Sequence, residues 1–595
     1  MGSCNARLCE DGNTGSVPHQ HVHQCLFPMY VVKVSDFLEM EGAPEPHHVL
    51  LQKGLLHQWK PGMRVIFVSH QWLGGVHPDP EGRHAAVLRS TLQGVMDGSL
   101  QVELDVAYDL DIDFAFFVEY TRQQVLSGYI FLDWFAIPQI TARAEGVNEE
   151  STKSDAALAV QSIPFYVETS NIFLALVPEV KHCTTGKFCN YASWLSRGWC
   201  RAELWCHLLS NKAFNQVIVV YSTKESQLMF PRDWQDNTIV DGDFTVESDR
   251  HVVKKLGEVA LEHKIQNLST AGPLNLYRFF LARRSKMLGE AEATTWEVET
   301  FLRHFKFPDL DAAILDKGSM SAVQCATFSG DVEMLRFLVQ KKADVNDSLQ
   351  GLAELGYPDH WNLLMTALES RQCPEMSLRQ GIWIRTLLDL GLDANSSTWE
   401  GTTCCSFAKS AAHVTELLRG RADLHRSGVP LGLVPMAKVA GMANLETLQK
   451  LLELRCDPNP PLQGLGITPL LSAVALSRGN PKSVEIVRSL LEARANPNVA
   501  SRQSGSIWLS LVAVGRVKVA LLGRETCTPQ TRSAATLPGS TPLLAAAGIG
   551  SEELVELLMS YGAYPQVNDR GESCEFLAEA NGHYNVLPCF QTVAV

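Results

Sequence analysis

The feature of this sequence that most constrains its fold is a short phrase that recurs between residues 335 and 565. Each copy has a Leu-Leu or Leu-Val pair, three or so residues, then Ala or Cys beside Asp or Asn. The copies are Leu335–Asn346, Ile384–Asn395, Thr415–His425, Leu448–Asn459, Val487–Asn498 and Val555–Pro565. Their small residues, Ala343, Ala394, Ala422, Cys456, Ala495 and Ala563, are spaced by 51, 28, 34, 39 and 68. A period of about 33 with insertions indicates a repeat array.

Two copies extend upstream into a TPLL opening, in Gly466–Asn498 and Gly539–Pro565. The opening suits a turn that leads into a short helix. The Leu-Leu pair then lies on the inner face of a second helix, which Gly, Ala and Asn or Asp close. This pattern resembles the ankyrin repeat, so the C-terminal region is predicted to be an all-α ankyrin solenoid.

A single repeat cannot bury its own apolar face, whereas stacked repeats share one core and form a groove that recognises another macromolecule. We therefore expect a protein partner to bind in the ankyrin groove. The alternative is an array that only spaces or solubilises its neighbour. Six copies span residues 318–565, and Gly571–Val586 is expected to cap the end.

The segment from residue 500 to residue 537 lacks the phrase. It is either a decayed repeat or an insertion in a hairpin loop. The apolar run Ile507–Leu522 within it has strand-like character, which favours an insertion.

The N-terminal half has a different pattern. Short β-branched and aromatic runs are predicted to be strands at Arg64–His70, Tyr129–Asp133, Asn171–Val177 and Gln216–Ser222. Helical patterns lie between them at Arg83–Met96, Ser154–Tyr166 and Gly198–Leu209. Strands that alternate with helices predict βαβ units and a parallel sheet.

In such a sheet the ligand crevice lies outside the carboxyl ends of the strands. The candidate binding residues at these ends are Ser69, His70, Trp72, Asp133 and Trp134. Ser69 lacks a nucleophile-elbow sequence, which argues against serine hydrolase chemistry.

The order VIFVSHQW, YIFLDW, SNIFLALVPE, RGWCRAELW and VIVVYS resembles the Toll/interleukin-1 receptor (TIR) domain, a flavodoxin-like α/β fold. The match is best over Ala159–Ser222, and Trp199–Leu204 is its most specific piece. The SHQWLG, DWxxIPQ and RGWCRxEL set also resembles a group of ankyrin-bearing proteins of dinoflagellate algae, which implies no activity.

The TIR resemblance implies one of two functions. Some TIR domains associate with other TIR domains, and others cleave the nicotinamide–ribose bond of NAD with a glutamate on the Trp-Cys helix. The matching residue here is Glu203, with Asp133 as a second polar contact. A carboxylate in a crevice can stabilise an oxocarbenium-like centre. NAD would then be a substrate, and no cofactor is expected.

Simpler interpretations remain open. Glu203 could be a surface acid paired with Arg201, Trp199 and Trp205 could be core residues, and the α/β domain could be only a structural cap. No metal site is expected. The run Cys4, Cys9, His19, His21, His23 and Cys25 contains no CxxC pair, and glycines and prolines break the spacing of His70, His77 and His84.

Composition limits which partners and which cellular compartment we expect for the protein. A net charge of −14 argues against nucleic acid or an anionic membrane as the main partner. No run of 18 apolar residues and no signal-peptide core occurs, so we expect no membrane span and a cytoplasmic or nuclear protein with reduced thiols. The predicted domains are a tail with N-terminal helices (1–60), the α/β domain (61–223), a helical connector (224–316) and the array (317–595).

Overall fold

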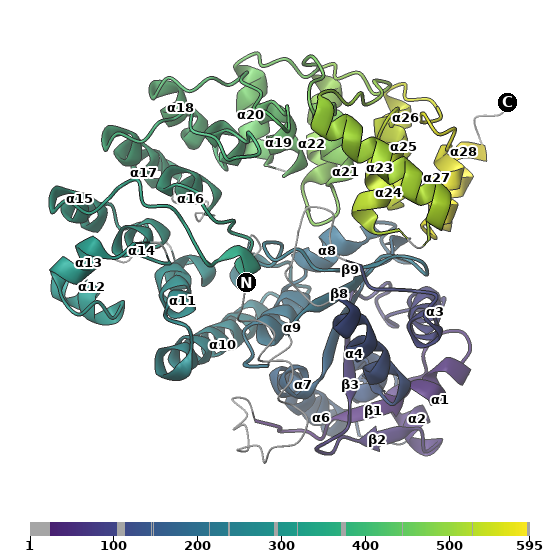
Figure 1. The fold of residues 1–595 in the computed structure, drawn as a ribbon. Coiled ribbons are helices and arrows are strands. Elements are labelled where there is room, and N and C mark those ends of the chain that lie inside the picture. The colour runs from purple at the N-terminus through teal and green to yellow at the C-terminus, as the bar shows by residue number, and fades with distance from the viewer. Residues whose placement is uncertain are drawn as a thin grey trace. The chain divides into compact units, whose positions relative to one another are not determined.

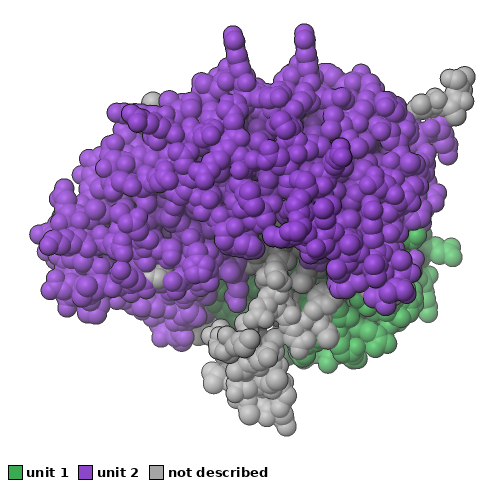
Figure 2. All heavy atoms as spheres, turned by 45° about the horizontal axis from the view of Figure 1, so that its top comes forward, with its two compact units in different colours: residues 1–230, 239–264 green, residues 231–238, 265–595 purple. Residues whose placement is uncertain are grey.

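The structure, a computed structural model, describes residues 24–103, 114–143, 146, 148–212, 215–235, 238–290, 295–317, 319–370, 377–442, 444–525 and 527–591. The chain forms two compact units, coloured separately in Figure 2. Unit 1 comprises Met1–Phe230 and Ile239–Lys264. Unit 2 comprises Pro231–Thr238 and Ile265–Val595. The cysteine and histidine run of the tail lies outside the described residues up to His23.

Unit 1 contains a seven-stranded mixed sheet in the order β2-β1-β4-β3-β5-β8-β9. The strands are β1 (Tyr30–Lys33), β2 (Leu56–Gln58), β3 (Val65–His70), β4 (Tyr129–Phe131), β5 (Ile172–Leu176), β8 (Val217–Val220) and β9 (Ser226–Leu228). A separate hairpin pairs β6 (Val180–Lys181) with β7 (Phe188–Cys189).

The four central strands are parallel, as the alternation of strands and helices predicted. Their register places Phe67 of β3 beside Phe131 of β4 and Phe173 of β5. The three rings stack across the sheet, with centroids 4.8 and 5.4 Å apart. All three side chains are buried, so this aromatic row forms the centre of the core.

The edges of the sheet depart from the expected parallel pattern. Strands β1 and β2 pair antiparallel and come from residues where only helices were predicted, and β9 adds an antiparallel edge beside β8. These strands are three or four residues long. Such short runs carry too little periodicity to be recognised in the sequence. The predicted strand at Tyr129–Asp133 ends at Phe131, and Asp133 begins a helical turn.

The helices of unit 1 pack around this sheet (Figure 1). They are α1 (Val34–Glu39), α2 (His47–Gln52), α3 (Arg83–Asp97), α4 (Phe114–Leu126), α5 (Asp133–Ala136), α6 (Glu149–Gln161), α7 (Ile163–Thr169), α8 (Tyr191–Ser196) and α9 (Gly198–Leu208). Helix α9 packs on α7 and β3, and α3 packs on α4. The predicted helix Ser154–Tyr166 is divided at Ser162 because Pro164 begins a new helix.

The parallel strand order β4-β3-β5-β8 determines where a ligand can bind. The chain passes from β3 to β4 on one side and then crosses to β5 on the other side. This is the strand order of doubly wound, flavodoxin-like sheets, whose ligand crevice lies where the direction of winding reverses. The carboxyl end of β3, which holds Ser69 and His70, lies at that point.

Helix α10 (Asp249–Ala271) runs through the division between the units at residue 264. The helices that follow are α11 (Leu274–Met287), α12 (Val298–His304), α13 (Leu310–Leu315), α14 (Ala322–Ser329), α15 (Val332–Gln340), α16 (Leu363–Glu369), α17 (Ser377–Asp389), α18 (Ala411–Arg419), α19 (Pro435–Gly441), α20 (Leu445–Glu453), α21 (Pro469–Ala475), α22 (Ser483–Glu492), α23 (Ser506–Leu522), α24 (Pro529–Thr536), α25 (Pro542–Ile549), α26 (Glu552–Ser560), α27 (Cys574–Ala580) and α28 (Leu587–Gln591). A short helical turn, η4 (Cys404–Phe407), precedes α18.

Each of the six recurring phrases begins on the second helix of a helix pair. One leucine of each copy is fully buried: Leu338, Leu387, Leu417, Leu451, Leu490 and Leu558. The closing asparagine connects neighbouring repeats. Asn395 Nδ2 donates to the carbonyl oxygen of Arg421 at 3.0 Å, and Asn459 Nδ2 donates to that of Arg494 at 3.0 Å. This contact gives a physical reason for the recurrence of Asn.

The asparagine contact also explains the interruption at residues 500–537. Asn498 Nδ2 donates to the carbonyl oxygen of Gly562 at 2.9 Å, and α21 and α22 pack on α25 and α26. The repeats on either side of the interruption are therefore stacked neighbours, and α23 with α24 forms a hairpin between them. The strand-like interpretation of Ile507–Leu522 is wrong, because this run forms the 17-residue helix α23. Its β-branched residues are compatible with both structures.

Candidate functional site

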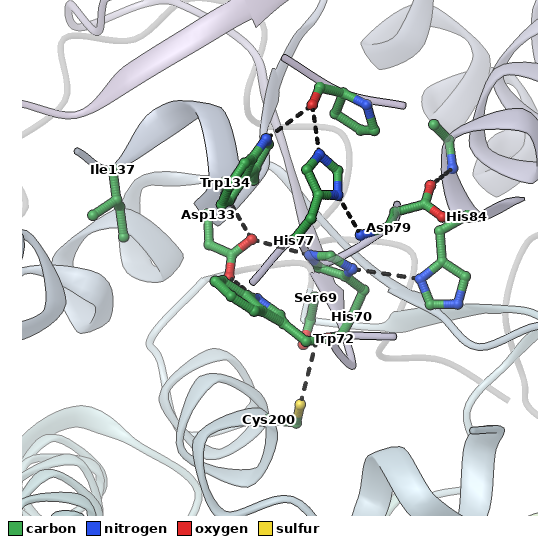
Figure 3. Close-up of polar contacts among 12 residues, drawn as sticks. Ser69, His70, Trp72, His77, Asp79, His84, Asp133, Trp134, Ile137 and Cys200 are labelled. Carbon is green, nitrogen blue, oxygen red and sulfur yellow. Dashed lines mark hydrogen bonds and ion pairs between the residues drawn. The ribbon is translucent and has the colours of Figure 1, made fainter. Parts of the chain in front are cut away.

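The carboxyl ends of β3 and β4 meet helix α9 in one cluster of polar side chains (Figure 3). The six residues singled out in the sequence contribute unequally to it. Ser69, His70 and Trp134 are buried. Asp133, Trp72 and Glu203 are partly exposed. The three buried residues can therefore position the other three, which alone could touch a ligand.

Ser69 holds the carboxylate of Glu203. Its Oγ donates to Glu203 Oε2 at 2.5 Å and accepts a hydrogen bond from Trp194 Nε1 at 3.0 Å. Both contacts use the only hydroxyl of a side chain that is 1% exposed. These two hydrogen bonds orient the Glu203 carboxylate relative to β3.

His70 and Asp133 form the second half of the cluster. His70 Nε2 lies 3.0 Å from Asp133 Oδ1. Asp133 also accepts hydrogen bonds from Trp72 Nε1 at 2.8 Å and from the backbone N–H of Trp134 at 2.7 Å. Figure 3 shows the Asp133 carboxylate between the His70 ring and the Trp72 indole. This network fixes the orientation of Trp72.

The electrostatics of the pair favour the ionised forms. Burial raises the pKa of the Asp133 carboxyl, but the charge and hydrogen bond of His70 reverse this and hold the pKa below its usual value. Burial lowers the pKa of the His70 imidazole, but the charge and hydrogen bond of Asp133, together with the charges of Asp79 and Glu203, outweigh it, so that pKa lies above its usual value. Both shifts favour an imidazolium beside a carboxylate.

Glu203 has the opposite tendency. Burial raises the pKa of its carboxyl to about 8, and the charge of Asp133 contributes in the same direction, against the lowering effects of Ser69 and His70. Two carboxyl groups whose pKa values are pushed apart in one cluster are the arrangement from which acid and base roles are assigned. Glu203 can change its charge near neutral pH, whereas Asp133 remains ionised.

A second set of hydrogen bonds holds Trp134, His77 and His84 next to the cluster. Trp134 Nε1 and His77 Nε2 both approach the carbonyl oxygen of Pro44, at 2.8 and 3.0 Å. His77 Nδ1 accepts from the backbone N–H of Asp79 at 2.9 Å, so both ring nitrogens of His77 are used within the protein. His84 Nδ1 lies 3.5 Å from His70 Nδ1, and burial followed by the charge of His70 holds the pKa of His84 well below its usual value.

The neighbours of Glu203 on α9 are held within the fold. Trp205 and Leu204 are buried core residues, and Trp199 Nε1 donates to Asp249 Oδ2 at 2.9 Å. Arg201 is buried and donates to the carbonyl oxygen of Leu195 at 2.5 Å. Trp194, which donates to Ser69, was not anticipated because it lies 125 residues away in the sequence and no motif connects them.

Unit 2 contains a second polar cluster, around residues 231–238. These residues form a segment, here called the docked segment, that packs within unit 2 although unit 1 flanks it on both sides in the sequence. The buried guanidinium of Arg232 pairs with the buried carboxylate of Glu369 at the end of α16 and lies over the ring of Trp361, 5.9 Å from its centroid. Lys409 Nζ approaches the same Glu369 oxygen at 3.3 Å.

Further contacts extend along the docked segment. Gln235 Nε2 donates to the carbonyl oxygen of Leu355 at 2.8 Å, and Gln235 Oε1 accepts from Arg283 Nη1 at 2.9 Å. Trp234 is buried. A side chain at Gly356 would collide with Arg232 at 2.4 Å, and one at Gly479 would meet the Asp233 carboxylate at 3.0 Å. The contacts thus come from α11 and from several repeats.

Comparison with known proteins supports the C-terminal part of this description. The ankyrin repeat family matches residues 465–502 and 538–570. These are the two repeats that precede and follow α23 and α24 in the sequence and stack directly on each other. The C-terminal region is an ankyrin-repeat array. The crystal structure of the human ASB11 ankyrin repeat domain is similar at 23% identity over 44% of this chain and 96% of that chain, with a TM-score of 0.30.

None of the helices that the structure describes combines the length and the apolar character needed to cross a lipid bilayer.

Proposed function

We propose that this protein is a cytoplasmic binding scaffold whose ankyrin array recognises a short segment of a protein partner. The observation that supports this most is the docked segment, since array residues hold this short stretch of chain, which turns at residues 231–235, through an ion pair, an aromatic contact and a hydrogen bond to a backbone carbonyl. Ankyrin arrays have the groove that such recognition needs.

The chemistry of the site favours a partner segment that carries an arginine. Glu369 is a buried carboxylate beside Trp361, a combination that suits a guanidinium, which pairs with the acid and stacks on the ring. The partner segment would therefore carry an arginine followed by an aromatic residue, as Arg232 and Trp234 are arranged here. The docked segment competes with it for the same groups.

In this proposal the α/β domain relays binding, through association with another copy or with another domain of its kind, as its resemblance to TIR domains implies. The proposed role of the protein in signalling depends on this association.

A test uses the full chain and a fluorescently labelled peptide with the sequence of residues 230–238. Arg232→Ala with Trp234→Ala releases the docked segment. We expect the released chain to bind the peptide saturably and the unaltered chain to bind it at least about tenfold more weakly, because a tethered segment competes at an effective concentration of order millimolar.

The control for this titration is a peptide with Arg232→Ala, which lacks the guanidinium. Fluorescence anisotropy measures both peptides on the same protein. Absence of saturable binding to the released chain, or equal binding of the two peptides, would contradict the proposal.

A second candidate function is cleavage of NAD by the α/β domain, with the ankyrin array directing it to a target. The observation that favours it is the pair of carboxyl groups with separated pKa values, Glu203 and Asp133, at the carboxyl end of β3. An ionised Glu203 would stabilise an oxocarbenium-like ribosyl centre. Trp72, held by Asp133, would lie beside the substrate.

A further inference from the structure

The hairpin of α23 and α24 has no role in the continuity of the repeat stack. The repeats before and after it bond directly to one another through Asn498 and Gly562, as described above. The hairpin is nevertheless anchored. Trp508 Nε1 donates to the carbonyl oxygen of Pro430 at 2.6 Å, and Val519 packs against Cys527 and Ala535. Figure 1 shows α23 and α24 as neighbouring helices.

Helix α23 presents its large apolar side chains to solvent. The following are 48–79% exposed: Ile507, Leu509, Leu511, Val514, Val517, Leu521 and Leu522. Within this helix only Gly515 and Val519 are fully buried. A helix with apolar side chains on all sides is normally covered, either by protein or by lipid. A contiguous exposed apolar surface of this kind marks an interaction site.

The charge of the hairpin favours lipid over protein as the cover of α23. Residues 500–537 contain five basic residues and one acidic residue, Glu525, although the chain as a whole has a net charge of −14. The basic residues are Arg502, Arg516, Lys518, Arg524 and Arg532. Arg516 pairs with Asp569 at 3.4 Å and Arg524 with Glu572 at 3.8 Å, so the charge offered to lipid comes mainly from the exposed side chains of Arg502 and Lys518. Helix α23 itself contains no acidic residue. Exposed Lys518 lies on its apolar surface, where its long stem can keep the ammonium at a lipid headgroup.

We propose that α23 docks this protein onto the surface of an anionic lipid bilayer, with its apolar face inserted among the headgroups and upper acyl chains. Apolar area and basic charge on one helix are the two requirements for such interfacial binding. A second copy of the chain would instead oppose two basic hairpins. The net negative charge of the whole chain argued against membranes, but it includes acidic residues outside the hairpin, which need not contact the bilayer. The helix lies in the interface and does not cross it.

The test measures sedimentation of the full chain with phosphatidylcholine vesicles, with and without phosphatidylserine. We expect binding to the anionic vesicles that weakens with added salt. Val517→Glu with Leu521→Glu should reduce it at least about tenfold, since two large apolar side chains no longer enter the lipid.

A matched control adds the same two charges elsewhere in unit 2, as Leu315→Glu with Trp399→Glu, at side chains that are 77% and 78% exposed. It should bind vesicles as the unaltered chain does, and circular dichroism should confirm that all three proteins fold. Three results would overturn the proposal: no binding to anionic vesicles, equal loss in both variants, or concentration-dependent dimerisation that replaces vesicle binding and disappears in the α23 variant.

Discussion

Glu369→Gln should lower the free energy of unfolding of the ankyrin array by about 3–5 kcal/mol. Glu369 is 3% exposed and is the carboxylate that Arg232 and Lys409 share. Removal of its charge leaves two cations in a buried site. The nearby Lys438 adds to this cost, because burial, followed by the charge of Arg232, already lowers its pKa to about 8.

Urea denaturation monitored by circular dichroism measures this loss. The matched control is Glu485→Gln, which removes the same charge from an exposed pair with Lys482 and should change the stability by less than about 0.5 kcal/mol. An equal effect of the two substitutions would show that the Glu369 cluster does not stabilise the array.

Glu203→Gln should remove the NAD-cleaving activity of the second candidate function by at least about a hundredfold, since the carboxylate that stabilises the reacting centre is lost. The unaltered chain should become more active as the pH rises through about 8, where the Glu203 carboxyl ionises. Nicotinamide release from NAD by the full chain measures both effects. Turnover that persists in Glu203→Gln would exclude this role.

The same substitution has a stability effect that does not depend on activity. The folded pKa of Glu203 is raised to about 8 from an unfolded value near 4.5, so the fold favours the protonated acid. Its contribution is therefore fully present below pH 4.5 and is lost as the pH rises towards 8, by about 2–4 kcal/mol. In Glu203→Gln this loss should disappear, whereas Glu39→Gln, at an exposed residue of α1, should retain it. An unchanged pH profile in Glu203→Gln would contradict the raised pKa of Glu203.

Part of the site could be predicted from the sequence. Ser69, His70 and Asp133 were found because buried strands have a recognisable composition and parallel strands bring their carboxyl ends together. Glu203 was singled out only because the segment Trp199–Leu204 resembles part of the TIR domain. Neither argument could reveal that Ser69 and Glu203 bond directly, because they lie 134 residues apart and their contact depends on how α9 packs on β3.

The largest differences arose where tertiary packing decides the outcome. The run that forms helix α23 was given strand-like character, since its valines and leucines suit either structure and only its packing on α24 distinguishes them. The docked segment was not anticipated either, because Arg232 and Glu369 belong to sequence regions that no local pattern relates.

The most direct test of the protein-binding proposal is a double-mutant cycle between the peptide and the array. The chain released by Arg232→Ala with Trp234→Ala is titrated, with and without Glu369→Gln, against the residue 230–238 peptide and its Arg232→Ala form. Because this chain already lacks Arg232, Glu369→Gln costs it less stability, and circular dichroism verifies folding. A coupling energy of at least about 1.5 kcal/mol between Glu369 and the peptide arginine is the predicted result. A coupling energy near zero would contradict recognition of an arginine-bearing segment by the array.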